Sequence, residues 1–300
     1  MRILITGATG FVGMNLMPML EDRCPQSEIL LLCRDVAKAN SLYPYANVCV
    51  RKSDDWSAVT AFRPEVVLHL ASLSTSRNDA EIIPELIQSN VMYGVQLLSA
   101  LKDVADLKLF VNTGTFAEYR CGAESINDAY LYAATKSAFR SFAAYYSQLS
   151  GYKYINVVPY TIYGGRPTIK RLMDYILESM HSPSPVDMTL GEQVLDFTHV
   201  DDLCDFYVHL LEHQELWENV NTGESFHVGT GVGTSIRDLA DMIEQVYGSP
   251  CNINWGGRPY RERDTMYAVA PIAKNMELLH WKAKITLRDG IIKMKNSNNG

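Results

Sequence analysis

Short apolar runs alternate with amphipathic segments over the first half of the chain. The first apolar run ends at Thr6, and apolar positions at helical spacing follow it. The runs predict strands over residues 1–6, 28–33, 48–51, 64–72, 107–112 and 154–159, and the spaced segments predict helices over residues 11–20, 56–62, 82–105 and 129–149. Parallel strands that are joined by crossover helices form a doubly wound sheet, so the sequence predicts an α/β fold.

Three glycines stand between the first predicted strand and the first predicted helix. Gly7 would let the chain turn sharply, Gly10 would let a diphosphate approach the backbone, and Gly13 would let helix and strand pack closely. Free N–H groups at a helix start favour an anion. This turn predicts a dinucleotide site on a Rossmann-like sheet, whereas a purely structural turn is the alternative. The expected contacts are those of Gly7, Thr9, Gly10, Phe11 and Val12.

The tip of the second strand bears on which dinucleotide is bound. In such a sheet an acid at this tip favours NAD through the ribose hydroxyls, and a cation favours the 2′-phosphate of NADP. Cys33 stands where the acid would be, and Arg34 follows it, so the sequence favours NADP while NAD stays possible. The alternative is that Arg34 is a solvated loop residue and Asp35 caps the next helix.

Two more strand ends offer candidate contacts. Asp54 follows the third strand and could contact the adenine, whereas Asp55 is expected to cap the next helix. Ala71 and Ser72 follow the fourth strand, at the carboxyl edge where such sheets bind ligands. His69 lies inside that apolar run, and we expect it to be a core residue.

The organisation of the chain changes after Tyr163. Loops lengthen, and Arg166, Pro167, Lys170 and Arg171 collect close together. We therefore expect two parts. A Rossmann domain would take residues 1–163 and be completed by about 196–228, including a return of the segment from residue 197 to the main sheet, and a smaller substrate-binding lobe would take residues 164–195 and 229–300.

Composition limits the classes of partner. A formal net charge of −7 means that the molecule as a whole would repel nucleic acid. Six cysteines are scattered without a CxxC pair, so reduced thiols are expected rather than disulfides or a metal site. No apolar run approaches membrane-spanning length. The first predicted strand begins at Met1, from which we expect no signal peptide and a cytoplasmic location.

Tyr132 and Lys136 stand four residues apart in a predicted helix, so they share one face. The ammonium of Lys136 would lower the pKa of the Tyr132 phenol and reach a nicotinamide ribose. Such a phenol can exchange a proton with a carbonyl oxygen while hydride moves at the carbon. The pair predicts an NAD(P)-dependent oxidoreductase, and a surface pair is the alternative.

Motifs in order along nearly the whole chain resemble the extended short-chain dehydrogenase/reductases, the NAD-dependent epimerase/dehydratase family, in its nucleotide-sugar branch. The matching pieces are the three glycines, residues 69–72, Asn90, residues 113–115, Tyr132 and Lys136, Tyr163 and Gly164, residues 191–202 and residues 278–281. The resemblance implies a catalytic triad of Thr115, Tyr132 and Lys136, with Thr113 as the fallback for Thr115. It also implies cofactor contacts from Leu70, Asn90, Tyr132, Lys136 and Pro159, and a homodimer formed by the helix over 82–105 and the aromatic face of the Tyr132 helix.

Departures from the family pattern narrow the chemistry. Dehydratases of this family carry an Asp-Glu pair directly after the catalytic Thr, where this chain has Phe116 and Ala117, so no dehydratase is expected. The loop from Thr115 to Tyr132 is also shorter than in typical 4-epimerases. Leu195 stands where the family usually has an arginine that contacts the nucleotide, so binding of the substrate would shift to Arg258, Arg261 or Arg263. The alternative is that these arginines form a solvated basic loop. The expected substrate contacts are Thr113, Thr161, Arg171, Gln193, Arg258 and Arg261.

Residues 112–116, 131–136 and 191–196 are similar to those of nucleotide-sugar 4-ketoreductases such as CDP-abequose and CDP-paratose synthases. The leading hypothesis is an NADP(H)-dependent reductase of a nucleoside-diphosphate 4-keto-deoxyhexose, with a CDP-linked substrate favoured and Tyr132 as general acid at the C4 oxygen. A 4-epimerase with tightly bound NAD and a non-catalytic dinucleotide sensor are the alternatives.

Overall fold

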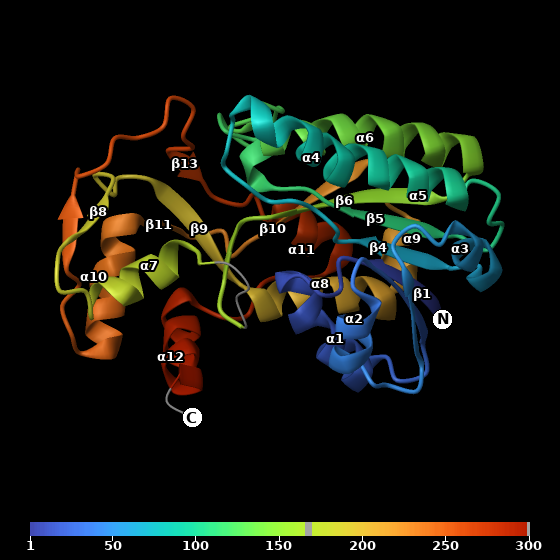
Figure 1. The fold of residues 1–300 in the computed structure, drawn as a ribbon, viewed down its shortest axis with the longest axis horizontal. Helices are drawn as coiled ribbons and strands as arrows, with labels where there is room; N and C mark the ends of the chain where they lie inside the picture. The colour runs from blue at the N-terminus through green and yellow to red at the C-terminus, as the bar shows by residue number, and fades with distance from the viewer. Residues whose placement is uncertain (166–169, 299–300) are drawn as a thin grey trace.

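A seven-stranded parallel sheet forms the larger part of the computed structural model, which describes residues 1–165 and 170–298 (Figure 1). The strand order is β10-β6-β5-β4-β1-β2-β3. The strands are β1 (Arg2–Thr6), β2 (Glu28–Cys33), β3 (Val48–Lys52), β4 (Val66–His69), β5 (Leu109–Thr113), β6 (Lys153–Pro159) and β10 (Glu224–Val228). This order confirms the predicted doubly wound sheet, and its direction reverses between β1 and β4, where ligands bind in such folds.

Helices cover both faces of this sheet (Figure 1). One face carries α1 (Phe11–Arg23), α2 (Val36–Leu42), α8 (Val200–Glu212), α9 (Gln214–Glu218) and α11 (Ala273–Leu279), and the other carries α3 (Trp56–Phe62), α4 (Ile83–Ile87), α5 (Tyr93–Leu101) and α6 (Leu131–Ser150). Along β1, Ile3 and Ile5 belong to the first core, and Leu4 belongs to the second. Because side chains alternate along a strand, a strand covered on both faces is apolar throughout.

The long helix predicted over residues 82–105 is interrupted. It consists of η1 (Ala80–Ile82), α4, a π-helical turn η2 (Gln88–Met92) and α5, which ends at Leu101. The prediction of one regular helix is therefore wrong at its centre and its end. A π turn adds a residue to the turn, and here it contains Asn90, which is buried.

A second, smaller sheet lies beside the first (Figure 1). It contains β7 (Thr161–Tyr163), β9 (Val194–His199), β11 (Gly233–Ser235) and β13 (Tyr267–Ala268), and a separate pair is formed by β8 (Val186–Met188) and β12 (Ile253–Trp255). The helices α7 (Leu172–Ser179), α10 (Ile236–Tyr247) and α12 (Leu287–Asn298) contribute to its own apolar cluster. A short 3₁₀ turn, η3 (Phe116–Glu118), follows β5.

The chain returns from the smaller sheet to the larger one later than expected. Residues 197–199 pair with β7 as part of β9, so they do not join the main sheet. The return begins with α8, which packs against α1, and ends with β10, which pairs with β6. Arg166 and Pro167, which belong to the basic segment noted in the sequence, lie outside the described residues.

Disulfides, metal clusters and membrane-spanning helices were looked for in the described residues. All six cysteines are free, and Cys33 and Cys204 are buried. No group of three His, Cys, Asp or Glu side chains within residues 1–165 and 170–298 is arranged to hold a metal ion. Across the same residues, none of the helices combines the length and the apolar character needed to span a membrane.

Candidate active site

The three glycines of the first turn have different surroundings. Gly7 has φ +75°, and a Cβ there would lie 2.6 Å from the backbone nitrogen of Ala71. A Cβ on Gly13 would lie 2.4 Å from the carbonyl oxygen of Ala8. Gly10 precedes α1 as its N-cap, and a Cβ there would meet only the carbonyl oxygen of Gly7, at 3.2 Å. The protein therefore needs glycine at positions 7 and 13 for its own packing, whereas Gly10 leaves room beside the free N–H groups of α1. This fits a bound diphosphate.

The exit of β4 is tied to the end of β1. Thr6 Oγ1 accepts a hydrogen bond from the Ala71 backbone nitrogen at 3.2 Å and bonds to Nδ1 of His69 at 2.8 Å. His69 is buried, and burial lowers its pKa to about 3, with the charge of Lys136 as a second cause. The ring is therefore neutral, which confirms His69 as a core residue. Leu70, Ala71 and Ser72 follow at this edge, and Pro159 ends β6.

Two acids near the predicted adenosine site serve as helix caps. The Asp35 carboxylate accepts a hydrogen bond from the Lys38 backbone nitrogen at 2.9 Å, and the Asp55 carboxylate accepts one from that of Ala58 at 3.0 Å. The Asp55 cap was expected, whereas the Asp35 cap belongs to the alternative in which Arg34 is a solvated loop residue. Arg34, directly after the buried Cys33, has an exposed side chain, and so has Asp54. Arg34 is thus a cation at the tip of β2. The carboxylate of its neighbour Asp35 is already engaged as a helix cap.

Asn90 joins three segments of the candidate site. Its amide nitrogen donates to the Leu73 carbonyl and to Thr135 Oγ1, both at 3.0 Å. Its amide oxygen accepts from the Leu73 nitrogen at 2.7 Å and from Ser72 Oγ at 3.3 Å. Thr135 in turn donates to the Tyr132 carbonyl at 2.7 Å. Because the whole amide is engaged, Asn90 acts in this arrangement by holding the segment after β4 against α6.

Tyr132 and Lys136 share one face of α6, as the spacing predicts. Lys136 is only 2% exposed, and this burial lowers its pKa to about 8, against the effect of Glu118, which raises it. Burial raises the pKa of Tyr132, while hydrogen bonds with Ser72 and Ser74 lower it. The expected net lowering of the Tyr132 pKa by Lys136 is therefore wrong, because removal of the phenol from water is the larger effect.

The two candidate threonines have different partners. Thr115 is the N-cap of η3, and its hydroxyl accepts a hydrogen bond from the Ala117 backbone nitrogen at 3.3 Å. Its own hydrogen stays available for a second acceptor. The Thr113 hydroxyl is bonded to the hydroxyl of Tyr207, which is fully buried, at 2.6 Å. The structure therefore favours Thr115 over Thr113 as the group that would hold a carbonyl oxygen.

Sequence reasoning missed Glu118. Its side chain is 0% exposed, it accepts a hydrogen bond from the Thr115 backbone nitrogen at 2.7 Å, and it pairs with Arg140. A signal was present, since an acid three residues after a threonine is the pattern of a capping box.

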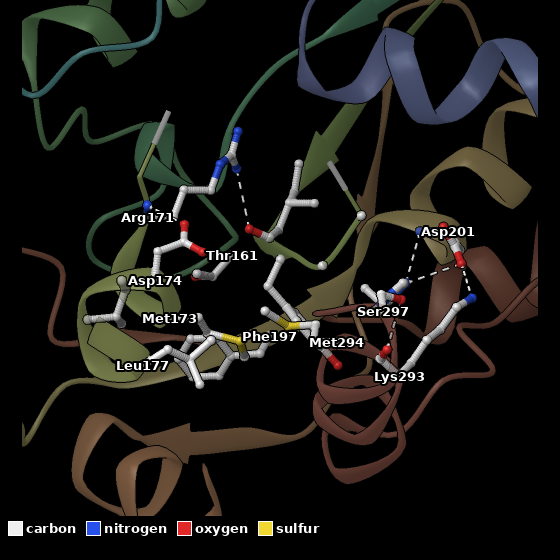
Figure 2. Close-up of a pocket in the computed structure, with 16 residues that line it drawn as sticks. Thr161, Arg171, Met173, Asp174, Leu177, Phe197, Asp201, Lys293, Met294 and Ser297 are labelled. Carbon is white, nitrogen blue, oxygen red and sulfur yellow. Dashed lines mark hydrogen bonds and ion pairs between the residues drawn. The ribbon is translucent and has the colours of Figure 1, made fainter. Parts of the chain in front are cut away.

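Two of the expected substrate residues meet in one pocket. Thr161 and Arg171 line it together with residues of α7, β9 and α12 (Figure 2). Arg171 also donates to the Ile162 carbonyl at 3.3 Å, and its guanidinium lies 4.0 Å from the centre of the Phe11 ring. Arg171 therefore joins this pocket to the glycine turn.

The other expected substrate residues lie on different segments. The Gln193 amide donates to the Thr265 carbonyl at 3.3 Å, so it is partly engaged inside the lobe. Arg258 is exposed after β12. Arg261 is also exposed, and its guanidinium lies 5.7 Å from the centre of the Tyr130 ring, directly before α6. The basic loop thus reaches the segment that leads to Tyr132.

Comparison with known proteins identifies the family. A model described as "NAD dependent epimerase/dehydratase family" matches residues 3–229. The chain belongs to this family. It is an enzyme of the extended short-chain dehydrogenase/reductase type. Among its relatives, the CDP-abequose synthase of Salmonella typhimurium is 27% identical over 303 residues, covering 96% of this chain and 95% of that protein. The UDP-glucose 4-epimerase of Mycolicibacterium smegmatis is 25% identical and covers 98% of this chain and 97% of its own.

Solved structures share the fold. The UDP-glucuronic acid 4-epimerase of Bacillus cereus, in complex with UDP-glucuronic acid and NAD, superimposes with a TM-score of 0.87 at 23% identity, covering 99% of this chain and 98% of that one. The UDP-glucose 4-epimerase of Thermus thermophilus, in complex with NAD, gives a TM-score of 0.82 at 22% identity, covering 100% and 99%.

Proposed function

We propose that the protein is an NADP(H)-dependent reductase of a nucleoside-diphosphate 4-keto-deoxyhexose, with a CDP-linked sugar as substrate. The observation that carries this proposal is that Thr115, at the start of η3, and Tyr132 and Lys136, on α6, follow the glycine turn along the chain. Phe116 and Ala117 stand where a dehydratase would carry acids. The likeness to CDP-abequose synthases over nearly the whole chain supports the reductive direction and the CDP group.

The residues of the chain divide the reaction between them. The glycine turn and the first N–H groups of α1 hold the diphosphate of the dinucleotide, which supplies the hydride when bound. Thr115 donates a hydrogen bond to the C4 oxygen and orients it. Tyr132 gives its phenolic proton to that oxygen as negative charge develops there. Because burial raises the pKa of Tyr132, the phenol keeps its proton until it is needed.

The choice of NADP rests on the tip of β2. Asp35 already accepts a hydrogen bond as a helix cap, and Arg34 is exposed beside it. A guanidinium pairs well with a phosphate, so these residues favour a dinucleotide that carries a 2′-phosphate.

The test is direct. Purified protein is supplied with NADPH and a CDP-4-keto-6-deoxyhexose, and the absorbance of the reduced nicotinamide is followed. Tyr132→Phe should lower the rate by about 10²- to 10⁴-fold, the usual contribution of a positioned proton donor. Tyr267→Phe, the same change at an exposed site on β13, is the matched control and should keep the rate. Absence of NADPH consumption with every 4-keto nucleotide sugar tried would refute the proposal.

A 4-epimerase is the second candidate. The similarity to the Mycolicibacterium smegmatis UDP-glucose 4-epimerase favours it, and the solved neighbours contain NAD. The same Thr115, Tyr132 and Lys136 would then act in both directions. Tightly bound NAD released on denaturation, with interconversion of UDP-sugars without added cofactor, would support this candidate over the reductase. Full biological activity of Tyr132→Phe would instead support a non-catalytic sensor.

The substrate contacts, the lobe and the oligomer belong to the same proposal. We place Thr161 and Arg171 on the sugar nucleotide, and we assign residues 164–195 and 229–300 to its lobe. We also propose a cytoplasmic homodimer through α4, η2, α5 and α6, because Met92, Phe142 and Tyr145 are 46%, 42% and 60% exposed on these helices. Analytical ultracentrifugation should give a dimer for the wild type and a monomer for Phe142→Glu.

A further inference from the structure

A buried ion pair lies beneath the turn that carries Thr115. The Glu118 carboxylate is 0% exposed, and its Oε2 atom lies 3.3 Å from Nη1 of Arg140. Arg140 also donates to the Tyr119 hydroxyl at 2.5 Å and to Ser225 Oγ at 2.7 Å. The guanidinium is therefore held on several sides, and the carboxylate cannot reach a substrate.

The carboxylate is built into the Thr115 turn. Its Oε1 atom accepts the Thr115 backbone N–H at 2.7 Å, while the Thr115 hydroxyl accepts the N–H of Ala117. These two bonds form a capping box, which fixes the backbone and the side chain of Thr115 together. A Cβ on Gly114 would lie 2.5 Å from Glu118 Oε1, so glycine at this position leaves the space that the carboxylate occupies.

The Glu118 carboxylate lies against the Tyr132 helix, where it pairs with Arg140 and accepts a hydrogen bond at 3.5 Å from Ser137 Oγ, next to Lys136. Tyr132, Lys136 and Arg140 follow one another at intervals of four residues on α6, which places them along one face. Lys136 is 2% exposed, and Glu118 is the group that acts against the effect of burial on its pKa. A buried ammonium without an opposite charge nearby is costly, so the carboxylate favours the charged form of Lys136.

The other titratable groups here do not replace this carboxylate. The groups in question are His69 from β4, Tyr154 from β6, Tyr119, Arg140, and Asp128, whose carboxylate accepts a hydrogen bond from Ser137 Oγ at 2.6 Å. His69 is neutral, since its pKa is lowered to about 3, and burial raises the pKa of Tyr154 so that its phenol is also neutral. Arg140 is a cation. Burial raises the pKa of the Glu118 carboxyl, and its pairing with Arg140 and its bond to the Thr115 N–H act against this effect. Glu118 is the carboxylate that favours the charged form of Lys136.

We propose that the Glu118–Arg140 pair is a positioning device for the reaction, which anchors Thr115 and supplies the counter-charge of Lys136. This inference rests on the proposed function only where it says that Thr115 and Lys136 serve catalysis. Glu118 is a positioning residue, because it acts through these two residues and touches no reacting atom.

Glu118→Gln separates the two roles. The amide oxygen of glutamine can still accept the Thr115 N–H, whereas the negative charge is lost. Lys136 should then lose its proton at a lower pH than in the wild type, where its pKa is about 8. Glu118 also raises the pKa of Tyr132, so its removal shifts both groups in the same direction.

The decisive measurement needs neither substrate nor dinucleotide. Lysine side chains labelled with ¹³C are titrated by NMR in the intact protein, and the Lys136 signal is assigned with Lys136→Arg. Its midpoint should fall by about one pH unit or more in Glu118→Gln, the usual effect of an opposite charge close by. An unchanged midpoint would overturn the inference, whether or not the protein reduces a 4-keto sugar.

A matched control distinguishes this effect from general damage. Asp202 is another buried carboxylate, and it accepts the backbone N–H groups of Lys284 and Ile285, both at 3.0 Å. Asp202→Asn should destabilise the fold and leave the midpoint of Lys136 unchanged. An equal shift in this variant would contradict the inference.

Two further readouts complete the test. If Glu118→Gln does not fold, the double variant Glu118→Gln with Arg140→Met removes both charges together, which proteins tolerate better than one unpaired charge. It should show a fall of the Lys136 midpoint in the same direction, made smaller by the loss of the Arg140 cation. In the active enzyme, Glu118→Gln should move the alkaline limb of the kcat/KM profile to lower pH. A role confined to folding would instead lower the rate by one factor at every pH.

Discussion

The two glycines that open α1 should respond differently to one added methyl group. At Gly10 the backbone angles, φ −85° and ψ 177°, suit alanine, and the methyl would meet only the Gly7 carbonyl oxygen, at 3.2 Å. At Gly13 the methyl would lie 2.4 Å from the oxygen and 2.5 Å from the Cα atom of Ala8. Gly10→Ala therefore changes the open side of the turn, and Gly13→Ala changes its packed side.

The magnitudes follow from these contacts. Alanine is a poorer N-cap than glycine, so Gly10→Ala should cost the fold about 0.5–1 kcal/mol. It should also displace a phosphate oxygen from a backbone N–H, a bond to a charged group that contributes about 1.5–3 kcal/mol. The dissociation constant for NADPH should then rise about 10- to 100-fold. Gly13→Ala overpacks the turn, at a cost of about 1–3 kcal/mol. The better helix propensity of alanine offsets only part of that cost.

Two assays separate the variants. NADPH fluorescence gives the dissociation constant, and thermal unfolding gives Tm. We expect Gly10→Ala to keep a Tm close to that of the wild type and to lose affinity. Gly13→Ala should lose about 2–4 °C of Tm for each kcal/mol of stability. Wild-type affinity in a folded Gly10→Ala protein would refute the assignment of the open side of this turn to a diphosphate.

The remaining predictions concern cofactor choice, packing and acid stability. Arg34→Ala should raise the dissociation constant of NADPH about tenfold, through loss of a charge-assisted bond, and leave that of NADH nearly unchanged in the same titration. Asn90→Leu should lower the free energy of unfolding in urea by about 2–4 kcal/mol, because the half-buried backbone groups of Leu73 and the buried Thr135 hydroxyl lose their bonds to Asn90, whereas Asn40→Leu at an exposed site should have little effect. His69 has a pKa of about 3 in the folded protein and 6.5 as its ordinary value. The unfolded chain therefore binds more protons between these values, so the stability that His69 contributes is complete above pH 6.5 and is lost as the pH falls. Unfolding free energy should drop by about 2 kcal/mol between pH 6.5 and pH 5 on this account, and His69→Gln should reduce that slope. An unchanged slope would contradict the linkage.

The main sheet could be predicted because its physical cause is local. A parallel strand that is covered on both faces must be apolar throughout, and the runs that end at Thr6 and Cys33 have this composition. The π turn around Asn90 could not be predicted in this way. Its apolar neighbours keep a helical spacing, and the extra residue is explained by bonds to Leu73 and Thr135, which are distant in sequence.

Those parts of the candidate site that depend on residues close together in the sequence could be predicted. The three glycines and the interval from Tyr132 to Lys136 are such spacings. The role of Glu118 was missed because it depends on Arg140, which lies 22 residues further along the chain. The contact between Arg171 and the Phe11 ring likewise depends on how the smaller lobe meets the first turn. The Tyr132 pKa went in the unexpected direction because a sequence shows neighbouring charges and does not show burial.

The pocket of Figure 2 is completed by α12, which is synthesised after its other lining residues. Lys293, Met294 and Ser297 of α12 form one wall, and residues around Thr161 and Arg171 form the other. During translation the earlier wall leaves the ribosome first and stays open to solvent until residues 287–298 follow. Loss of this helix would open the same wall again while the glycine turn and Tyr132 stayed in place. On the proposed function, a protein without this helix should still bind its dinucleotide and hold the sugar nucleotide weakly, so the binding of the two ligands would depend on different parts of the chain.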